Sequence, residues 1–228
     1  MITWLLLAPL IGLLILFALP ARVVKYWATA VLALGPAMIA AMSMDFDAQQ
    51  GLQFVERVPW IPSLGVHYYV AVDGISILIL GLTAVIGLIA ALASWNSIVD
   101  RVKEYYAMLL LLQAAMYGVF VAQDLVLFFV FFEFSLVPMY FIIGIWGGER
   151  KLYAAIKFFI YTFTGSVLLL IGMISLYFQS GAQTFDFAEL LRGSLDPVVA
   201  QWIFWAFFIA FAVKIPMFPF HTWLPDAH

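Results

Sequence analysis

Two charged side chains stand inside long apolar runs of this sequence. Glu133 lies in DLVLFFVFFEFSLVPMYFIIGIW (124–146), nine residues after Asp124, and Lys214 lies twelve residues after Trp202 in WIFWAFFIAFAVKIPMFPF. At 1.5 Å per helical residue, these charges are about 13 Å and 18 Å into their runs. A charge at that depth in a bilayer costs roughly 2.5–3.5 kcal/mol, so it normally faces a protein interior or a wet cavity. In neighbouring helices, a carboxylate and an ammonium at similar depth would offset each other's desolvation, and their pKa values would be coupled.

Prolines stand close to both charges. Pro138 follows Glu133, and Pro216 and Pro219 follow Lys214. A proline inside a helix lacks the N–H that its helix needs, so each span is expected to kink or break there. Broken helices at membrane depth often hold ions in transporters. The structural alternatives are a protonated, hydrogen-bonded Glu133 and a Lys214 that extends to the membrane interface.

Other polar residues give weaker signals. Lys157, about one turn inside its run, fits an interfacial lysine and a step in a proton path equally well. His221 is equally consistent with a proton relay near Lys214 and with a polar junction, and for His228 the polar junction is favoured. Two histidines without a third ligand do not predict a metal site. Asp73 precedes an apolar run, where an acid complements the helix dipole.

The composition places the chain in a membrane. It has 228 residues, of which 66% are hydrophobic and 10% charged, and its mean hydropathy is +1.09. A net charge of −3 provides no basic face for nucleic acid. With no cysteine and three histidines, the chain offers no thiolates for an iron–sulfur cluster and a poor set of haem ligands. We expect no cofactor, no metal and no redox chemistry in this chain.

Seven apolar runs are long enough to be spanning helices of about 20 residues. They predict an all-α, multi-pass membrane protein with a broken seventh helix, and they lie at 2–19, 26–44, 71–93, 105–122, 124–146, 153–178 and 199–219. Lysine and arginine pairs mark alternate loops, which places the N-terminus outside. Residues 1–100 are predicted to hold three spans and an external cover at 45–70, and residues 101–228 the other four.

A family resemblance extends over the third to the seventh run. It rests on VDGIS, on the Glu followed by FSL and Pro-Met, on WGG, on AAIKFF, and on Lys with two prolines before HTWLPDAH, in that order. These motifs resemble the M-type antiporter-like subunits of NADH:quinone oxidoreductase (respiratory complex I), which are related to Mrp-type antiporters. The resemblance implies a fold of about fourteen helices with inverted repeats, of which 101–228 would form an incomplete first repeat.

The resemblance also implies roles for particular residues. Glu133 matches the mid-membrane Glu that pairs with the Lys of the broken helix, which Lys214 matches, while Lys157 and His221 match possible relay positions. It implies a proton-translocating subunit, driven by redox-linked change in other subunits that hold NADH, FMN, iron–sulfur clusters and quinone. Its partners would be neighbouring membrane-arm subunits, the remaining helices and the lipid of a bacterial inner membrane, or of an organellar inner or thylakoid membrane.

Three alternatives stay open. An Mrp-type cation/proton antiporter would use the same motifs without NADH chemistry. The arm of a membrane-bound hydrogenase is a further relative. A structural scaffold, in which the buried charges only hold helices in register, belongs to a different functional class.

Overall fold

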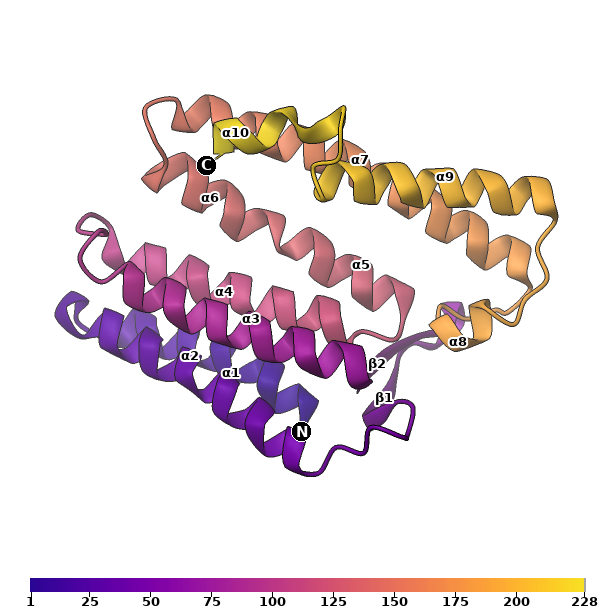
Figure 1. Cartoon of the computed structure of the whole chain (residues 1–228), viewed down its shortest axis with the longest axis horizontal. Helices are drawn as coiled ribbons and strands as arrows, with labels where there is room; N and C mark the ends of the chain where they lie inside the picture. Colours follow the sequence, from indigo (N-terminus) through magenta and orange to yellow (C-terminus); the bar gives the residue numbers. More distant parts are fainter. Residues whose placement is uncertain (228) are drawn as a thin grey trace. The chain divides into compact units, whose positions relative to one another are not determined.

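The chain is almost entirely helical, and its computed structural model describes residues 1–227 (Figure 1). His228, for which we predicted a polar junction, lies outside the described residues. The longer helices are α1 (Ile2–Ala18), α2 (Ala21–Met44), α3 (Gly74–Ala93), α4 (Val102–Val121), α5 (Leu125–Phe134), α6 (Leu136–Trp146), α7 (Lys151–Ser180) and α9 (Pro197–Lys214). The shorter elements are β1 (Gln53–Ile61), η1 (Pro62–Leu64), β2 (Val66–Val72), α8 (Phe187–Leu190), η2 (Phe220–Trp223) and α10 (Leu224–Ala227).

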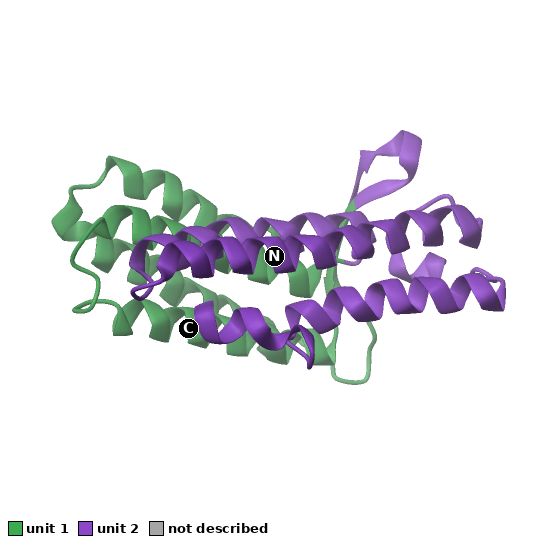
Figure 2. Ribbon diagram, turned by 90° about the horizontal axis from the view of Figure 1, so that it is seen from above, with its two compact units in different colours: residues 1–57, 68–122 green, residues 58–67, 123–228 purple. Residues whose placement is uncertain are grey.

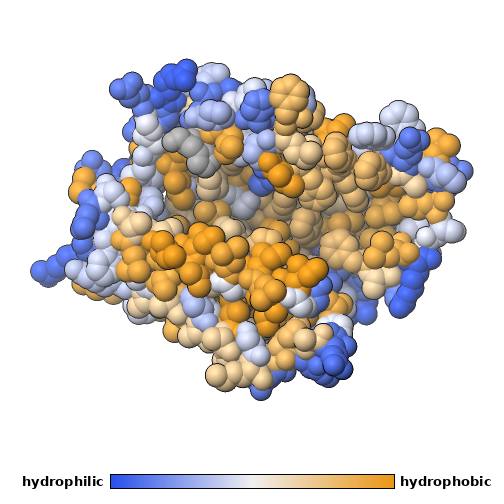
Figure 3. All heavy atoms as spheres, in the orientation of Figure 1, coloured by the Kyte–Doolittle hydropathy of each residue, from blue (hydrophilic) through white to orange (hydrophobic). Residues whose placement is uncertain are grey.

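The helices confirm the predicted membrane fold. Within residues 1–227, six helices are long and apolar enough to cross a bilayer when α5 and α6 count as one span, Leu125–Trp146. Helix α1 is a shorter apolar helix of 17 residues. Apolar side chains cover the middle of the helices on the visible face, and hydrophilic ones gather toward their ends (Figure 3). The protein is an integral membrane protein.

The chain forms two compact units (Figure 2). The first contains residues 1–57 and 68–122, and the second contains residues 58–67 and those from 123 onward. Helix α4 packs against α1, α2 and α3, and so belongs to the first unit. The compact units therefore do not follow the division at residue 100 that we expected from the sequence.

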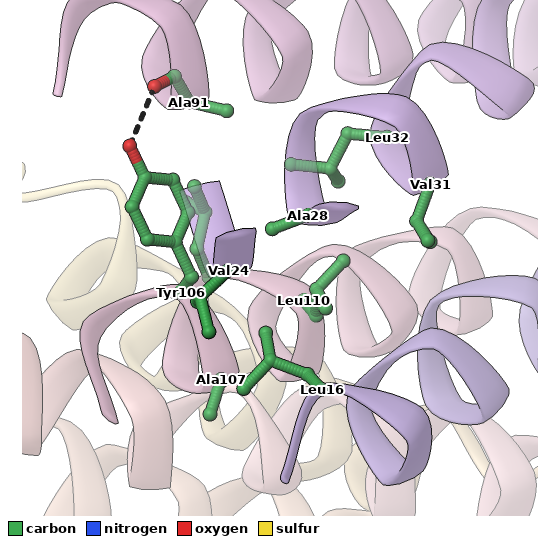
Figure 4. Close-up of a cluster of buried hydrophobic side chains, with 10 residues drawn as sticks. Leu16, Val24, Ala28, Val31, Leu32, Ala91, Tyr106, Ala107 and Leu110 are labelled. Atoms are coloured by element: carbon green, nitrogen blue, oxygen red, sulfur yellow. Dashed lines mark hydrogen bonds between the residues drawn. The ribbon is translucent and has the colours of Figure 1, made fainter. Parts of the chain in front are cut away.

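The first unit has a well-packed apolar core. Figure 4 shows part of it, in which side chains from all four helices meet and the Tyr106 hydroxyl donates to the Ala91 carbonyl at 3.1 Å. Gln113 is buried and donates to the Thr83 carbonyl at 3.2 Å. A buried hydroxyl or amide without a partner is costly, so these bonds fix how α3 and α4 pack.

The segment that we predicted as an external cover, 45–70, contains most of a β-hairpin. Strands β1 and β2 pair as a two-stranded sheet, and their sequences, QFVERVPWI and VHYYVAV, are rich in the β-branched and aromatic residues that favour strands. Asp73 follows β2 and caps α3, accepting from the Ile75 and Ser76 N–H groups while Ser76 accepts from the Asp73 N–H. The N-terminal role predicted for Asp73 is therefore confirmed.

In the second unit, α7 and α9 pack closely because α7 carries glycines where α9 approaches. A Cβ on Gly172 would lie 2.6 Å from Phe207 Cε1, and one on Gly165 would lie 3.2 Å from Val213 Cβ. Small residues allow such backbone approach in membrane proteins, where association depends on packing. The two glycines are seven residues apart, two helical turns, so they lie on the same face of α7.

Replacing Gly172 by Ala should weaken the α7–α9 contact. The added methyl would overlap the Phe207 ring, and overpacking of this kind costs about 1–3 kcal/mol. The matched control is Gly144→Ala on α6, whose Cβ would meet Ala155 at 3.4 Å, an ordinary contact. We expect a lower melting temperature for Gly172→Ala than for Gly144→Ala in the full-length protein in detergent. Equal melting temperatures would show that Phe207 moves aside at no cost.

Candidate functional site: two interrupted helices and their charges

The fifth span is interrupted one turn before its proline. Helix α5 ends at Phe134, Ser135 links it to α6, and Pro138 lies inside α6. The Ser135 N–H donates to the Phe131 carbonyl at 3.1 Å, and its hydroxyl donates to the Phe132 carbonyl at 2.7 Å. Because Pro138 has no N–H to offer to the turn before it, the helical ladder is weakened at this level. Glu133 therefore lies just before a local irregularity in a span that otherwise runs from Leu125 to Trp146.

The seventh span ends at its lysine, as the prolines predicted. Helix α9 stops at Lys214, and the chain resumes as η2 at Phe220. Pro216 cannot donate to the Ala212 carbonyl, and the Met217 N–H does so instead at 2.9 Å. The indole N–H of Trp223 then donates to the Val213 carbonyl at 2.9 Å. Carbonyls that lose their helical donors are thus satisfied from further along the chain.

Both charges are partly buried in the second unit. The Glu133 carboxylate interacts with the Ser166 hydroxyl of α7 and with the charge of Lys214. Lys214 Nζ lies 3.4 Å from Ser135 Oγ and 4.5 Å from the centroid of the Phe132 ring. Phe128 and Phe132 of α5 also meet Phe211 of α9 edge to face. The two interrupted helices therefore bring a carboxyl group and an ammonium group within electrostatic reach.

The hydrogen bonding at this pair is incomplete. Within residues 1–227, Glu133 Oε1 is buried without a hydrogen-bond partner. Lys214 lies in the last turn of α9, where a cation is favoured by the helix dipole. A carboxylate oxygen with free acceptor capacity beside an ammonium can receive a proton without first breaking a hydrogen bond. The arrangement therefore leaves a buried acceptor with free capacity in the same region as a cationic side chain.

Lys157 is held at a second charge cluster. Its Nζ donates to Asp226 Oδ2 and to the Thr222 carbonyl, both at 2.7 Å, and Arg150 lies 3.0 Å from Asp226 Oδ1. The hydrogen bond from Lys157 holds the pKa of Asp226 below its usual range. The pair is therefore charged at neutral pH and is lost only as the pH falls through that lowered pKa. A cavity of about 350 Å³ borders the cluster, lined in part by Arg150, Lys151 and Asp226.

His221 lies in η2, after the break in α9. Its ring is 5.6 Å from that of Phe218, and within the described residues its Nδ1 is buried without a hydrogen-bond partner. A relay role for His221 remains a prediction.

The sequence did not reveal the partners that hold these residues. Asp226 and Ser166 lie 69 and 33 residues from the lysine and the glutamate that they contact, so no local spacing relates them. One signal was available for Asp226: it is the single acid in HTWLPDAH, on the side of the membrane to which the Arg150–Lys151 loop was predicted. Ser166 and Trp223 carry no such signal.

Comparisons with known sequences identify the family. Residues 122–228 match the family described as NADH:quinone oxidoreductase/Mrp antiporter, transmembrane. The chain is 50% identical over 195 residues to NADH-quinone oxidoreductase subunit M of Rhodobacter capsulatus. This alignment covers 80% of the chain and 38% of that protein. It is 40% identical over 229 residues to NAD(P)H-quinone oxidoreductase chain 4 of Gloeobacter violaceus, which covers 100% of this chain and 43% of that one. The chain spans less than half the length of these relatives.

Solved structures show the same fold. A chain of respiratory complex I from Thermus thermophilus with bound NADH matches with a TM-score of 0.87 and 30% identity, over 100% of this chain and 47% of that one. A chain of the Mrp complex from Dietzia sp. matches in fold, with a TM-score of 0.86 and 24% identity, over 99% of this chain and 25% of that one. The chain thus belongs to the family of antiporter-like membrane subunits that NADH:quinone oxidoreductase shares with Mrp antiporters.

Proposed function

We propose that this chain works as part of a proton-translocating membrane-arm subunit of NADH:quinone oxidoreductase. The observation that carries the proposal is that Glu133 and Lys214, from the fifth and seventh spans, lie within electrostatic reach of each other, each close to an irregularity in its helix. Two relatives are named as subunits of quinone oxidoreductases, which supports this complex as the assembly in which the chain works. In the proposed topology the N-terminus faces outward, in a bacterial inner membrane or an organellar or thylakoid membrane of equivalent type.

The proposed cycle uses the coupling between the two charges. Glu133 holds a proton on Lys214 while the two are paired, and redox-linked change in other subunits separates them and releases it. Moving one charge against 100 mV requires about 2.3 kcal/mol, and one pKa unit corresponds to about 1.36 kcal/mol. A shift of a few units in the pKa of the pair is therefore sufficient to move one proton against such a potential. NADH, FMN, iron–sulfur clusters and quinone are placed in the partner subunits.

Replacing Glu133 by Gln in the full-length assembly should remove most NADH-driven proton translocation. Glutamine fills the same space and keeps a hydrogen-bond acceptor for Ser166 but carries no charge for Lys214. Proton uptake by inverted membrane vesicles and NADH:quinone reductase activity are the measurements. Glu104→Gln, which alters an exposed pair with Arg101, is the matched control and should behave as wild type. Normal pumping by Glu133→Gln would refute the proposed function.

One other function is favoured by a specific observation. The family that matches residues 122–228 includes Mrp antiporters, which would move another cation against protons. Deletion of the gene for the full-length protein distinguishes the two functions. Loss of NADH-driven proton uptake supports the oxidoreductase. Loss of sodium extrusion with normal NADH oxidation supports the antiporter. Co-purification with quinone-reducing subunits gives an independent answer.

A further inference from the structure

Helix α4 of the first unit carries a buried tyrosine, Tyr117. It is 2% exposed, and among the described residues its hydroxyl has no hydrogen-bond partner. The Gln113 side chain, one turn earlier on α4, lies close enough to interact with this hydroxyl, but its amide N–H donates to the Thr83 carbonyl at 3.2 Å. Because a buried hydroxyl without a partner costs free energy, a further group that bonds it is expected beside Tyr117.

A small cavity adjoins this tyrosine. It has a volume of about 10 Å³, and residues of α1, α2 and α4 line it, among them Tyr117 and Gln113. A space of roughly 10–15 Å³ is the smallest that admits one water molecule, which also needs two to four polar partners. The cavity therefore has the size for a single water, and the polar groups around it decide whether water binds.

Two prolines supply further polar groups at the cavity. Pro9 lies inside α1 and Pro36 inside α2. A proline has no N–H, so Pro9 cannot donate to the Leu5 carbonyl. Pro36 leaves the Leu32 carbonyl without its helical donor in the same way. Leu5 and Leu32 are both buried, and both line the cavity. In membrane helices, ordered water is one of the groups that satisfy carbonyls freed by proline.

A glycine of α2 fixes the hydroxyl at this place. A Cβ on Gly35 would lie 2.1 Å from the Tyr117 hydroxyl oxygen and 3.3 Å from Tyr117 Cζ. Only a residue without a side chain leaves room for the tyrosine there. Gly35 also lines the cavity, and it follows Leu32 by three residues, less than one helical turn. The hydroxyl is therefore held against α2 close to the carbonyl that Pro36 leaves without a donor.

We propose that this cavity binds one water molecule, which links three helices of the first unit. The water accepts a hydrogen bond from the Tyr117 hydroxyl and donates its two hydrogens to the carbonyls of Leu5 and Leu32. These three partners come from α4, α1 and α2. A bridging water is nearly as favourable as a direct hydrogen bond, so it ties α1 and α2 to α4 at the level where each of the two helices contains a proline.

A cryo-electron microscopy map of the full-length assembly, at a resolution that shows ordered water, tests the site directly. We expect a density peak about 2.5–3.2 Å from Tyr117 Oη and at a similar distance from at least one of the two carbonyl oxygens. A map in which Tyr117 donates to Gln113, with no water beside the hydroxyl, would overturn the proposal. This measurement needs no variant, so it decides the question even if a substitution prevents assembly.

Replacing Tyr117 by Phe tests whether the hydroxyl is bonded, because phenylalanine keeps the ring and removes only that group. Loss of a bond to water should lower the melting temperature of the full-length protein in detergent by about 2 °C. Tyr106→Phe, which removes a buried hydroxyl with a direct partner on the same helix, should also lower it. Tyr26→Phe, at a side chain that is 52% exposed, should not. An equal or higher melting temperature for Tyr117→Phe would contradict the proposal, since removing an unbonded buried hydroxyl costs nothing.

A double substitution distinguishes a bridging water from a direct bond between Tyr117 and Gln113. Pro36→Ala restores the N–H that the Leu32 carbonyl lacks, so the water loses one of its two acceptors. Substitutions that share a partner are not additive. Tyr117→Phe should therefore lower the melting temperature less in the Pro36→Ala background than in wild type. Equal shifts in the two backgrounds would show that the hydroxyl and the carbonyl share no water.

Discussion

Replacing Lys214 by Met in the full-length protein should abolish NADH-driven proton translocation while the assembly remains intact. Methionine is close to lysine in length and apolar, so it fills the space beside the Phe132 ring without the ammonium group. Glu133 would then lose the cation that shares its buried environment. No other cationic side chain of the described residues is shown in contact with Glu133, so the proton would have no base to move to.

The measurements are proton uptake by inverted vesicles and the amount of assembled complex on native gels. Lys214→Arg should keep the complex assembled but lose most of its proton uptake, because arginine keeps the charge but does not release protons at physiological pH. Lys103→Met is the matched control: Lys103 Nζ also donates at the end of a helix, to the Phe17 carbonyl at 3.0 Å, but in the first unit. Substantial pumping by Lys214→Met would exclude Lys214 from the proton path.

Replacing Trp223 by Ala should have the largest effect on stability. The indole is 6% exposed, packs against Phe158 with ring centroids 5.3 Å apart, and belongs to a cluster with Leu136, Ile143, Ala154 and Ala155. Truncating a buried tryptophan typically costs about 3–5 kcal/mol. The change also removes the N–H that satisfies the Val213 carbonyl. We expect a clearly lower melting temperature and a loss of proton translocation.

Two variants separate packing from hydrogen bonding at Trp223. Trp223→Phe keeps most of the ring but leaves the Val213 carbonyl without its donor, which should cost about 1–3 kcal/mol. Trp202→Ala removes an indole from α9 that is 72% exposed, and it should change the melting temperature little. A Trp223→Ala protein that is as stable as Trp202→Ala would show that η2 does not support α9.

The sequence predicted the spanning helices well because a bilayer imposes a simple rule of length and hydropathy. It also predicted a kink or break after Lys214, because a proline cannot supply the missing donor whatever surrounds it. The interruption of the fifth span was expected near Pro138, and the structure places the boundary at Ser135, whose hydroxyl takes over a backbone carbonyl. Local chemistry was sufficient for these features.

Features that depend on distant segments were not predictable in the same way. The pairing of β1 with β2 inside the segment predicted as a cover was not expected from the sequence. The partners of Lys157 and Asp124 come from segments 69 and 57 residues away. Asp124 was used only as the boundary of a span, whereas it is a buried acid that caps α5 and accepts from the hairpin. Such contacts arise from tertiary packing, which a single sequence does not encode in its spacing.

The glycine contacts between α7 and α9 limit which helices could move during the proposed transport cycle. The side chains of α9 pack directly against Gly165 and Gly172 of α7, which leaves little room for the two helices to tilt toward each other. Residues 215–219 contain two prolines and lie outside any helix, so they form the natural pivot. The segment that moves would then be Phe220 to Ala227. Its contacts with the rest of the unit include the hydrogen bond of the Trp223 indole and the salt bridges of Asp226.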